Sequence, residues 1–368
     1  MYIHERKEWP DFTWDQTCVT ALLADTRHLQ GRLLGRMEAL GFALREEASL
    51  QSLTQDVLKT CEIEGVILDF EQVRSSIARR LGIDIGISPH VARNVEGIVE
   101  VMMDATRNYN TPLTTRRLFD WHAALFPTGR SGMHRITVGA WRGDSSGPMQ
   151  VVSGPAGRER IHFEAPDHER LKAEMDRFIR WFNGSMEMDL VLKSSLAHFR
   201  FITIHPFDDG NGRIARAISD MLLAKSEEST QRFYSLSSQI QKERSTYYQI
   251  LEKCQKGTLD ITMWLEWFLG CLKRAVEGSE KTLEAILTKA RFWKHHAGES
   301  FNDRQYSMVN RLLNGFEGKL TSSKWAKIQK CSQDTALRDI NNLVDRKILR
   351  RERAGGRSTS YALITTEE

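Results

Sequence analysis

Apolar residues recur at every third or fourth position along most of the chain. Two such series are Leu50, Leu53, Val57 and Cys61, and Ile214, Ile218, Met221 and Leu222. This spacing places the apolar side chains on one face of a helix, whereas long alternating patterns typical of strands are nearly absent. The sequence therefore predicts a mainly α-helical protein.

Two segments depart from this pattern. From about Gly139 to Pro166, glycines and prolines separate two short strand-like pieces, 149–152 and 160–163, which we expect to pair as an exposed hairpin. After about Gly298 a short helix–turn–helix pattern is followed by the strand–turn–strand segment KILRRERAGGRSTSYALI. The second change predicts a separate C-terminal module.

Composition narrows the class of protein. A chain of 368 residues with 40% hydrophobic and 27% charged residues is typical of a soluble protein with two or three domains. The start of the chain, MYIHERKEWPDF, does not resemble a signal peptide, and no apolar run approaches the ~20 residues of a membrane helix. We therefore expect a cytoplasmic protein without a membrane partner. The charge of the chain gives no further indication of a partner. Its net charge of +4 is too small to indicate nucleic-acid binding by the chain as a whole.

The cysteines indicate neither a disulfide framework nor a zinc site, because they are odd in number, widely scattered and without CxxC spacing. We expect them to be small core residues. They are Cys18, Cys61, Cys254, Cys271 and Cys331.

The string HPFDDGNGRIAR, residues 205–216, predicts a tight loop between two helices. The preceding helix should stop near His205, because a residue before proline is driven out of the α region. The segment RIARAISDMLLAK is helical again. Gly210, Asn211 and Gly212 would therefore present backbone N–H groups at the start of a helix, where anions bind.

Other residues of the loop suggest phosphate chemistry. Arg213 and Arg216, three residues apart, could fork onto phosphate oxygens. Asp209 is a candidate ligand for Mg²⁺, and His205, which titrates around neutral pH, could remove a proton from an attacking hydroxyl. A glycine-rich turn with capping residues is the structural alternative. It does not account for a base, a metal carboxylate, an anion site and two arginines within twelve residues.

HPFDDGNGRIAR resembles, without a mismatch, the Fic family signature HxFx[DE]GNGRxxR. The resemblance implies transfer of AMP from ATP to a hydroxyl side chain of a target protein, with release of pyrophosphate. It makes His205 the general base and Asp209 the Mg²⁺ ligand. The intact GNGR favours nucleotidyl transfer over the phosphoryl transfer of the related Doc branch. The implied nucleotide-binding residues are Asp209, Gly210, Asn211, Gly212, Arg213, Ile214, Ala215 and Arg216.

The resemblance extends to two more segments. IHFEAP is similar to the end of the family's flap, a hairpin that pins the target by strand addition; Ile161, His162 and Phe163 would set its register and border the nucleotide. STYYQILEKCQKG is similar to the adenosine-contacting helix, with Tyr247, Tyr248 and Gln255 as candidates. The alternatives are a hairpin that only covers the core and, for each aromatic residue, core packing.

Upstream, TCEIEG predicts a helix end, with Gly65 as the left-handed residue after it and Glu64 in the last turn. A carboxylate there faces the negative end of the helix dipole unless a cation compensates it. Thr60, Glu64 and Gly65 resemble the family's inhibitory motif [ST]xxxE[GN], which implies that Glu64 pairs with Arg216. The flanking sequence resembles an N-terminal helical domain that often accompanies the family, and Asp69 with Gln72 provides a capping signal.

The C-terminal segment has the outline of a winged helix, which supports a different function, DNA-binding regulation. Ser332 would cap its second helix. Asp334 and Asp339 on the same face argue against DNA binding. The expected core stripe is Leu337, Ile340, Leu343, Val344 and Ile348, the candidate base readers are Gln333, Thr335, Arg338 and Asn342, and the candidate phosphate contacts are Arg350, Arg351, Arg353 and Arg357.

Together these features predict a Fic-fold helical bundle with a small β-hairpin flap and a C-terminal winged-helix module. We expect an N-terminal helical domain at 1–95, a catalytic domain at 96–280 and the winged helix at 298–368. ATP is the expected substrate, Mg²⁺ the metal, and a protein with a Ser, Thr or Tyr hydroxyl the partner. Self-modification, a homodimer and DNA binding are left open.

Overall fold

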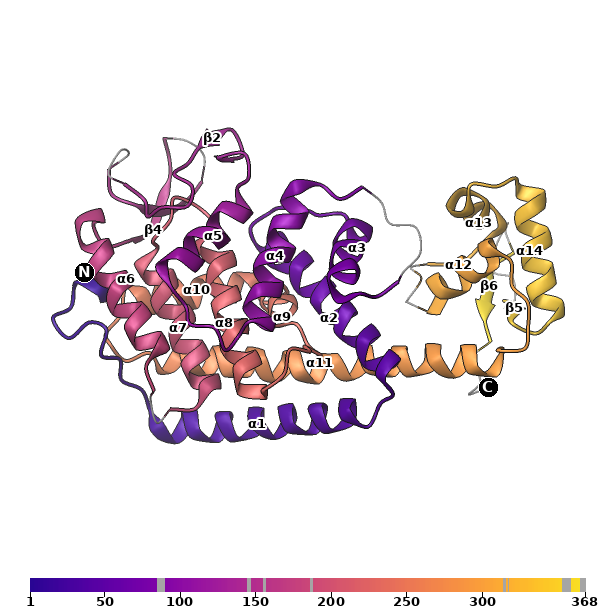
Figure 1. Cartoon of the computed structure of the whole chain (residues 1–368), viewed down its shortest axis with the longest axis horizontal. Helices are drawn as coiled ribbons and strands as arrows, with labels where there is room; N and C mark the ends of the chain where they lie inside the picture. The colour runs from indigo at the N-terminus through magenta and orange to yellow at the C-terminus, as the bar shows by residue number, and fades with distance from the viewer. Residues whose placement is uncertain are drawn as a thin grey trace. The chain divides into compact units, whose positions relative to one another are not determined.

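The computed structural model describes residues 1–84, 90–143, 147–154, 157–185, 188–313, 316, 318–352 and 359–364, without the side chains of residues 281, 282 and 285. The chain forms two compact units, Met1–Ser279 and Glu280–Glu368 (Figure 1). The boundary falls within helix α11 (Thr262–His295). The finer division of the first unit into two domains stays a prediction.

The first unit consists mainly of helices, as the apolar spacing predicts, with two small antiparallel hairpins. A short 3₁₀ helix, η1 (Ile3–Glu5), precedes them. The helices are α1 (Gln16–Glu38), α2 (Phe42–Ile63), α3 (Phe70–Leu81), α4 (Arg93–Arg107), α5 (Thr115–Leu125), α6 (His168–Asn183), α7 (Leu190–Ile204), α8 (Asn211–Glu227), α9 (Leu236–Lys242), α10 (Arg244–Gln255) and the first part of α11.

Helix α7 lies at the centre of this unit, and every residue from Val191 to Ile204 is buried. Its N-cap is Asp189, whose carboxylate accepts the Val191 N–H at 2.7 Å. It ends at His205 before Pro206, as expected. A helix buried on all sides needs neighbours all round, and α8 packs along it after the turn (Figure 1).

Helix α2 packs against α9, α3 and α8. Its predicted apolar stripe is buried, from Leu50 to Cys61. The helix ends at Ile63, Glu64 is its C-cap, and Gly65 has the left-handed φ of 79° that the sequence predicts. Helix α3 begins at Asp69, whose carboxylate accepts the Gln72 N–H at 2.9 Å, so that capping prediction is confirmed.

The expected hairpin forms from β3 (Gln150–Ser153) and β4 (Arg160–Glu164), within one residue of the predicted bounds. Val151 pairs with Phe163 and Val152 with Ile161, and the register shifts between them. A smaller hairpin, β1 (Arg130–Ser131) with β2 (His134–Arg135), was not predicted, because strands of two residues leave no periodic pattern.

The second unit contains α12 (Asp303–Leu313), α13 (Ser322–Gln329) and α14 (Gln333–Asp345), followed by the antiparallel pair β5 (Leu349–Arg351) and β6 (Tyr361–Leu363). Ser332 caps α14 by accepting the Thr335 N–H at 3.2 Å, as expected. Ile340, Leu343 and Ile348 are fully buried. The winged-helix assignment itself stays a prediction.

Three expectations for the C-terminal segment are wrong. Leu337 is 42% exposed rather than in the core, because it lies beside the face of α14 that Ala336, Ile340 and Leu343 bury, not within that face. Asp339 is buried and accepts a hydrogen bond from Arg304 Nε at 2.7 Å, so it is not on an exposed face. Thr335, a candidate base reader and therefore expected to be exposed, is only partly exposed. Arg353 and Arg357 lie outside the described residues.

Cys61, Cys254 and Cys271 are buried as expected, but Cys18 is exposed on α1 and Cys331 is only partly buried. Cys18 lies in the first turn of α1 next to its cap Asp15, away from the buried positions of that helix. Among the described helices, none combines the length and the apolarity needed to cross a membrane.

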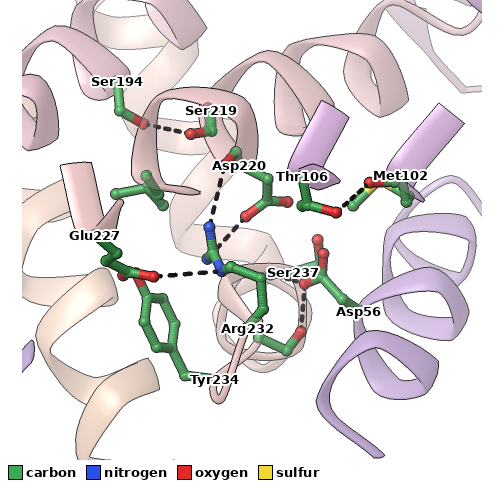
Figure 2. A network of polar contacts seen from close by, with 12 residues as sticks. Asp56, Met102, Thr106, Ser194, Ser219, Asp220, Glu227, Arg232, Tyr234 and Ser237 are labelled. Carbon is green, nitrogen blue, oxygen red and sulfur yellow. Dashed lines mark hydrogen bonds and ion pairs between the residues drawn. The ribbon is translucent and has the colours of Figure 1, made fainter. Parts of the chain in front are cut away.

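A buried ionic network joins α8 to the loop that follows it (Figure 2). Arg232 Nη2 lies 3.1 Å from Asp220 Oδ1, and Arg232 Nε lies 4.0 Å from Glu227 Oε2. Asp56 of α2 faces the same region and accepts the Ser237 N–H at 3.1 Å. Burial, with Asp56 adding to it, raises the pKa of Asp220 well above its usual range, while Arg232 opposes the rise. One guanidinium therefore compensates several buried carboxyl groups.

We expect Arg232→Met to lower the free energy of unfolding by about 3–5 kcal/mol at pH 7.5, because removal of one partner leaves buried carboxylates uncompensated. The loss should shrink toward pH 5, where the buried carboxyl groups take up protons more readily. Urea unfolding followed by tryptophan fluorescence at both pH values measures this. Arg180→Met, on an exposed position of α6, is the control. Equal losses for the two variants would contradict the prediction.

Candidate active site

The loop between α7 and α8 reverses the chain within a few residues. His205 has φ 51° and ψ 60°, and Gly210 has φ 83° as the N-cap of α8. The Asn211 side chain braces the loop: its Oδ1 accepts the Phe207 N–H at 3.0 Å, and its Nδ2 donates to the Phe207 carbonyl at 2.8 Å. The side chain of Asn211 is therefore committed to the loop, which leaves its backbone N–H as the group for an anion.

His205 is the candidate base. Its Nδ1 lies 3.2 Å from the Ile202 carbonyl, so the neutral ring donates there and leaves Nε2 as a proton acceptor. Burial lowers the pKa of His205 to about 4, although the Ile202 carbonyl and nearby carboxylates oppose this. The expectation that His205 titrates near neutral pH is therefore wrong, because burial penalises the imidazolium form. The imidazole is neutral, and able to accept a proton, at pH 7.

Two carboxylates follow the histidine. Asp209 accepts hydrogen bonds from the Ser131 hydroxyl and from the Gly210 N–H, and its side chain is 42% exposed. Asp208 accepts the Thr137 N–H at 2.8 Å. Within the described ranges, no three metal-ligating side chains gather at one place. Since Mg²⁺ is commonly held by one or two carboxylates together with substrate phosphates, the exposed carboxylate of Asp209 fits that role.

The two arginines of the loop motif differ in their surroundings. Arg213 lies over the Phe126 ring, 4.8 Å from its centre, and 3.8 Å from Asp209. Arg216 is 1% exposed and is held by α2. Its Nε donates to Thr60 Oγ1 at 2.6 Å, and its Nη2 donates to the Thr60 carbonyl at 2.9 Å and to Glu64 Oε1 at 2.7 Å.

The Glu64 carboxylate also lies directly against the first turn of α8. A β-carbon added at Gly212 would be 2.2 Å from Glu64 Oε1, so only glycine allows this approach. The N-terminus of a helix attracts anions through its free N–H groups and its dipole. A carboxylate of the chain itself thus lies where the sequence predicts a phosphate site. At Gly65, next to it, an added β-carbon would meet no atom within 4 Å.

A cavity of about 1080 Å³ brings most of the predicted residues together. His205 and Asp209 line it from the loop, Glu64 from α2, and the hairpin and α10 complete its wall. The predicted residues that line it are Glu64, His162, Phe163, His205, Asp209, Asn211, Gly212, Tyr247, Tyr248 and Gln255. Those that do not are Thr60, Gly65, Ile161, Gly210, Arg213, Ile214, Ala215 and Arg216.

Three of the residues that do not line the cavity are either buried in the core or exposed on the hairpin. Ile214 and Ala215 are fully buried, because the helical turn after Gly212 carries them into the core between α8 and its neighbours. Ile161 is 44% exposed on the hairpin. Their assignment as nucleotide contacts therefore has no support from the lining of the cavity.

On α10, two of the three candidates already have partners. The Tyr247 hydroxyl lies 3.0 Å from His198 Nε2, and Gln255 Nε2 donates to Thr203 Oγ1 at 3.2 Å. Tyr248 is 37% exposed, with the guanidinium of Arg244 5.3 Å from its ring centre. Tyr248 is therefore the aromatic ring best placed to stack on a base.

The hairpin is fastened to α10 beside the cavity. His162 Nδ1 lies 2.6 Å from Glu252 Oε2, and Arg160 Nη2 lies 3.0 Å from Glu252 Oε1. Although burial opposes it, hydrogen bonds from Lys256, His162 and Arg160 lower the pKa of Glu252 to about 2. Phe163 is 1% exposed and packs against Tyr2, with ring centres 5.2 Å apart.

Sequence reasoning missed several residues of the site, namely His122, Arg142, Asp208 and Glu252. His122 Nε2 lies 3.1 Å from the Asp209 carbonyl, and its Nδ1 accepts the Gly139 N–H at 3.2 Å. No local pattern marks these positions, because their partners lie far away in the chain. Of these four residues, Asp208 alone lies within the motif of residues 205–216, and its place beside Asp209 was the one available signal.

Two family models match the chain. Residues 2–83 match a domain of unknown function, DUF4172, and residues 112–223 match the Fic/DOC family. The second match contains the whole loop of residues 205–216.

Among curated proteins, the chain is similar to the protein adenylyltransferase Fic of several insects. It is 27% identical over 252 residues to that of Drosophila ananassae, covering 67% of this chain and 44% of the relative. It is 24% identical over 251 residues to that of Culex quinquefasciatus, covering 66% and 45%. The chain thus spans less than half the length of these relatives.

Solved structures share the fold. A Fic family protein from Desulfovibrio desulfuricans aligns with 96% of this chain and 98% of its own, at 21% identity and a TM-score of 0.55. Fic-1 from C. elegans aligns with 72% of this chain and 73% of its own, at 17% identity and a TM-score of 0.51. The described helices with their small hairpins are therefore a Fic fold. Residues 112–223 of this chain thus match the Fic/DOC family, and the chain shares its fold with solved Fic proteins.

Proposed function

We propose that this chain is a protein adenylyltransferase that moves AMP from ATP to a Ser, Thr or Tyr hydroxyl of a target protein. One observation carries the proposal: His205, Asp209 and the N-terminal turn of α8 border the same cavity of about 1080 Å³. A base, a carboxylate that fits Mg²⁺ and an anion site are the groups that nucleotidyl transfer needs. The similarity to proteins named protein adenylyltransferase Fic agrees with this chemistry.

In the proposed reaction, Nε2 of the neutral His205 accepts the proton of the target hydroxyl. The hydroxyl oxygen forms a bond to the α-phosphorus of ATP, the bond from that phosphorus to the bridging oxygen breaks, and pyrophosphate leaves. The backbone N–H groups at the start of α8, where Asn211 and Gly212 line the cavity, hold the phosphates. The resemblance adds the Arg213 guanidinium, which lies outside the lining of the cavity. Asp209 would hold Mg²⁺, which offsets the negative charge of the phosphates when it is bound.

We infer that Glu64 inhibits this reaction. Its carboxylate is hydrogen-bonded to Arg216 at 2.7 Å and lies against Gly212 at the anion site. A nucleotide entering the cavity would meet a negative charge where its phosphates belong, and Arg216 would be unable to reach the γ-phosphate. Since Thr60 takes two further hydrogen bonds from Arg216, the arginine is fixed to α2 at both its Nε and its Nη2.

The hairpin is the proposed docking edge for the target. Val152 and Ile161 are 47% and 44% exposed there, and an extended peptide could pair along this edge. The chain itself is a further candidate acceptor. DNA binding by the second unit stays a prediction. Asp334 and Asp345 are exposed on α14 near Arg338, and their negative charges argue against it.

The base is tested by His205→Ala. Transfer of AMP should fall by a factor of about 100 to 10,000, the range of a lost general base. Nucleotide binding should persist, because the anion site consists mainly of backbone groups. Self-labelling with ATP labelled at the α-phosphate and calorimetry with a non-hydrolysable ATP analogue give the two readouts. Labelling at the wild-type rate would rule out His205 as the base.

The protonation state of His205 leads to a prediction on pH. Because burial lowers its pKa to about 4, the imidazole loses its proton well below neutrality, and kcat/KM should stay level from pH 8 to about pH 5. It should fall only as the pH approaches 4, where the protonated ring can no longer accept a proton. A decline centred near pH 6.5 would instead indicate a solvated histidine.

Inhibition is tested by Glu64→Gly. Release of Arg216 and of the anion site should raise self-labelling by a factor of about 100, the gain expected when a reacting group misplaced by about 1 Å is aligned. Glu62→Gly, at the same end of α2, controls for the effect of a glycine on the helix terminus. Adding Arg216→Ala to Glu64→Gly should remove much of the gain. Additive effects of the two changes would mean that the residues act independently.

A further inference from the structure

Arg142 is a buried guanidinium whose hydrogen-bond acceptors are all backbone carbonyls. It is 5% exposed. Its Nε donates to the His205 carbonyl at 2.8 Å, its Nη2 donates to the Pro166 carbonyl, and its backbone N–H donates to the Pro206 carbonyl at 3.0 Å. Among the described side chains, none forms an ion pair with it. Burial lowers the pKa of Arg142, although Asp208 and Asp167 nearby oppose this.

Such a residue is costly, since a buried charge without a paired carboxylate is destabilising unless its hydrogen bonds compensate for the lost water. A buried carbonyl could be satisfied more simply by another backbone N–H. The arginine is distinguished by its planar fork, which donates in several fixed directions at once. The two carbonyls that this fork binds, those of His205 and Pro166, therefore define what the side chain holds together.

The acceptors belong to two parts of the site. His205 and Pro206 form the start of the catalytic loop, whereas Pro166 follows β4, the second strand of the hairpin. Arg142 itself precedes β3, so both ends of the hairpin meet the loop at this one residue. Its side chain binds the His205 and Pro166 carbonyls, and its backbone N–H binds the Pro206 carbonyl. Ala165, just before Pro166, donates its N–H to the Met149 carbonyl at 2.9 Å and closes the base of the hairpin.

The rest of the loop has other supports. The Asp209 carbonyl lies against His122, the Asp209 carboxylate against Ser131, and the Phe207 backbone against Asn211. These contacts hold the anion site and the metal carboxylate without Arg142. Among the described side chains, Arg142 is the one that joins the hairpin to the backbone of His205. His205 is in the left-handed conformation that L-residues other than glycine adopt rarely.

We propose that Arg142 is a positioning residue that sets the distance between the target backbone on the hairpin and the imidazole of His205. This inference rests on the proposed adenylyl transfer. It divides the site into two halves with separate supports. The nucleotide half is held by α8, His122 and Ser131. In the acceptor half, α10 holds the hairpin strand β4 and Arg142 links the hairpin to His205. Loss of Arg142 therefore acts on the transfer step rather than on the binding of ATP.

The test uses the full chain with Glu64→Gly as the active parent. Arg142→Met removes the fork and its charge, whereas Arg142→Lys keeps the charge but cannot donate in two fixed directions. Arg135→Met, at an exposed position of β2, is the matched control. For self-labelling we expect kcat to fall by a factor of about 100 in Arg142→Met, as for a misplacement of about 1 Å. We expect a smaller fall in Arg142→Lys, and KM for ATP within a factor of about two of the parent in both.

A second readout is the pKa of His205, which depends on the positive charge of Arg142. Arg142 is among the groups that, after burial, lower the pKa of His205. In Arg142→Met the acid limb of kcat/KM, and the His205 titration followed by nuclear magnetic resonance, should therefore move to higher pH. In Arg142→Lys neither should move. A residue that only stabilised the fold would not separate the two variants in this way.

Three results would overturn the proposal: a rise in KM for ATP at unchanged kcat, equal kcat in parent and Arg142→Lys, or a loss of kcat in Arg135→Met as large as in Arg142→Met. If the Glu64→Gly parent itself transfers no AMP, the proposed function fails. The role of Arg142 is then decided by the His205 titration, where an unchanged pKa in Arg142→Met counts against it.

Discussion

The backbone of the loop between α7 and α8 must find hydrogen-bond partners in a buried place, and the site depends on this constraint. Pro206 ends a helix that is buried on every side, so the turn after it cannot be solvated freely. Side chains take the place of water: Arg142 meets the first carbonyls, Asn211 the Phe207 backbone and His122 the Asp209 carbonyl. The groups that carry the proposed chemistry are rigid because their backbone is held in this way.

Helix α2 is aligned to the site by polar residues at four-residue spacing in an otherwise apolar face. Asp56 holds the start of α9 through the Ser237 N–H, while Thr60 and Glu64 hold Arg216. Apolar contacts alone would tolerate a small shift of the helix along its axis, whereas hydrogen bonds at successive turns do not. The register that results brings the Glu64 carboxylate against Gly212. Inhibition, as proposed, is thus a matter of helix register as much as of one ion pair.

Local signals predicted the elements that border the site. The end of α7 at Pro206, the cap of α3 at Asp69 and the hairpin strands within one residue all follow from rules that act over a few neighbouring positions. The wrong predictions for α14 concern which side of the helix is buried. Leu337 looks like a core residue but faces solvent, and Asp339 looks like a surface residue but is buried with Arg304. A helical period gives the spacing of a face, and only the neighbouring elements decide which face is covered.

By itself, the sequence determined that the chain is mainly helical and that residues 205–216 form a glycine-rich turn at the start of a helix. It also placed a carboxylate at the end of α2, because caps, glycines and prolines act through their own backbone. Tertiary structure alone decided that Arg142 and His122 support the loop, that Tyr247 has a partner, and that His205 has a pKa of about 4. Those properties depend on desolvation and on contacts between segments far apart in the chain, which no local pattern encodes.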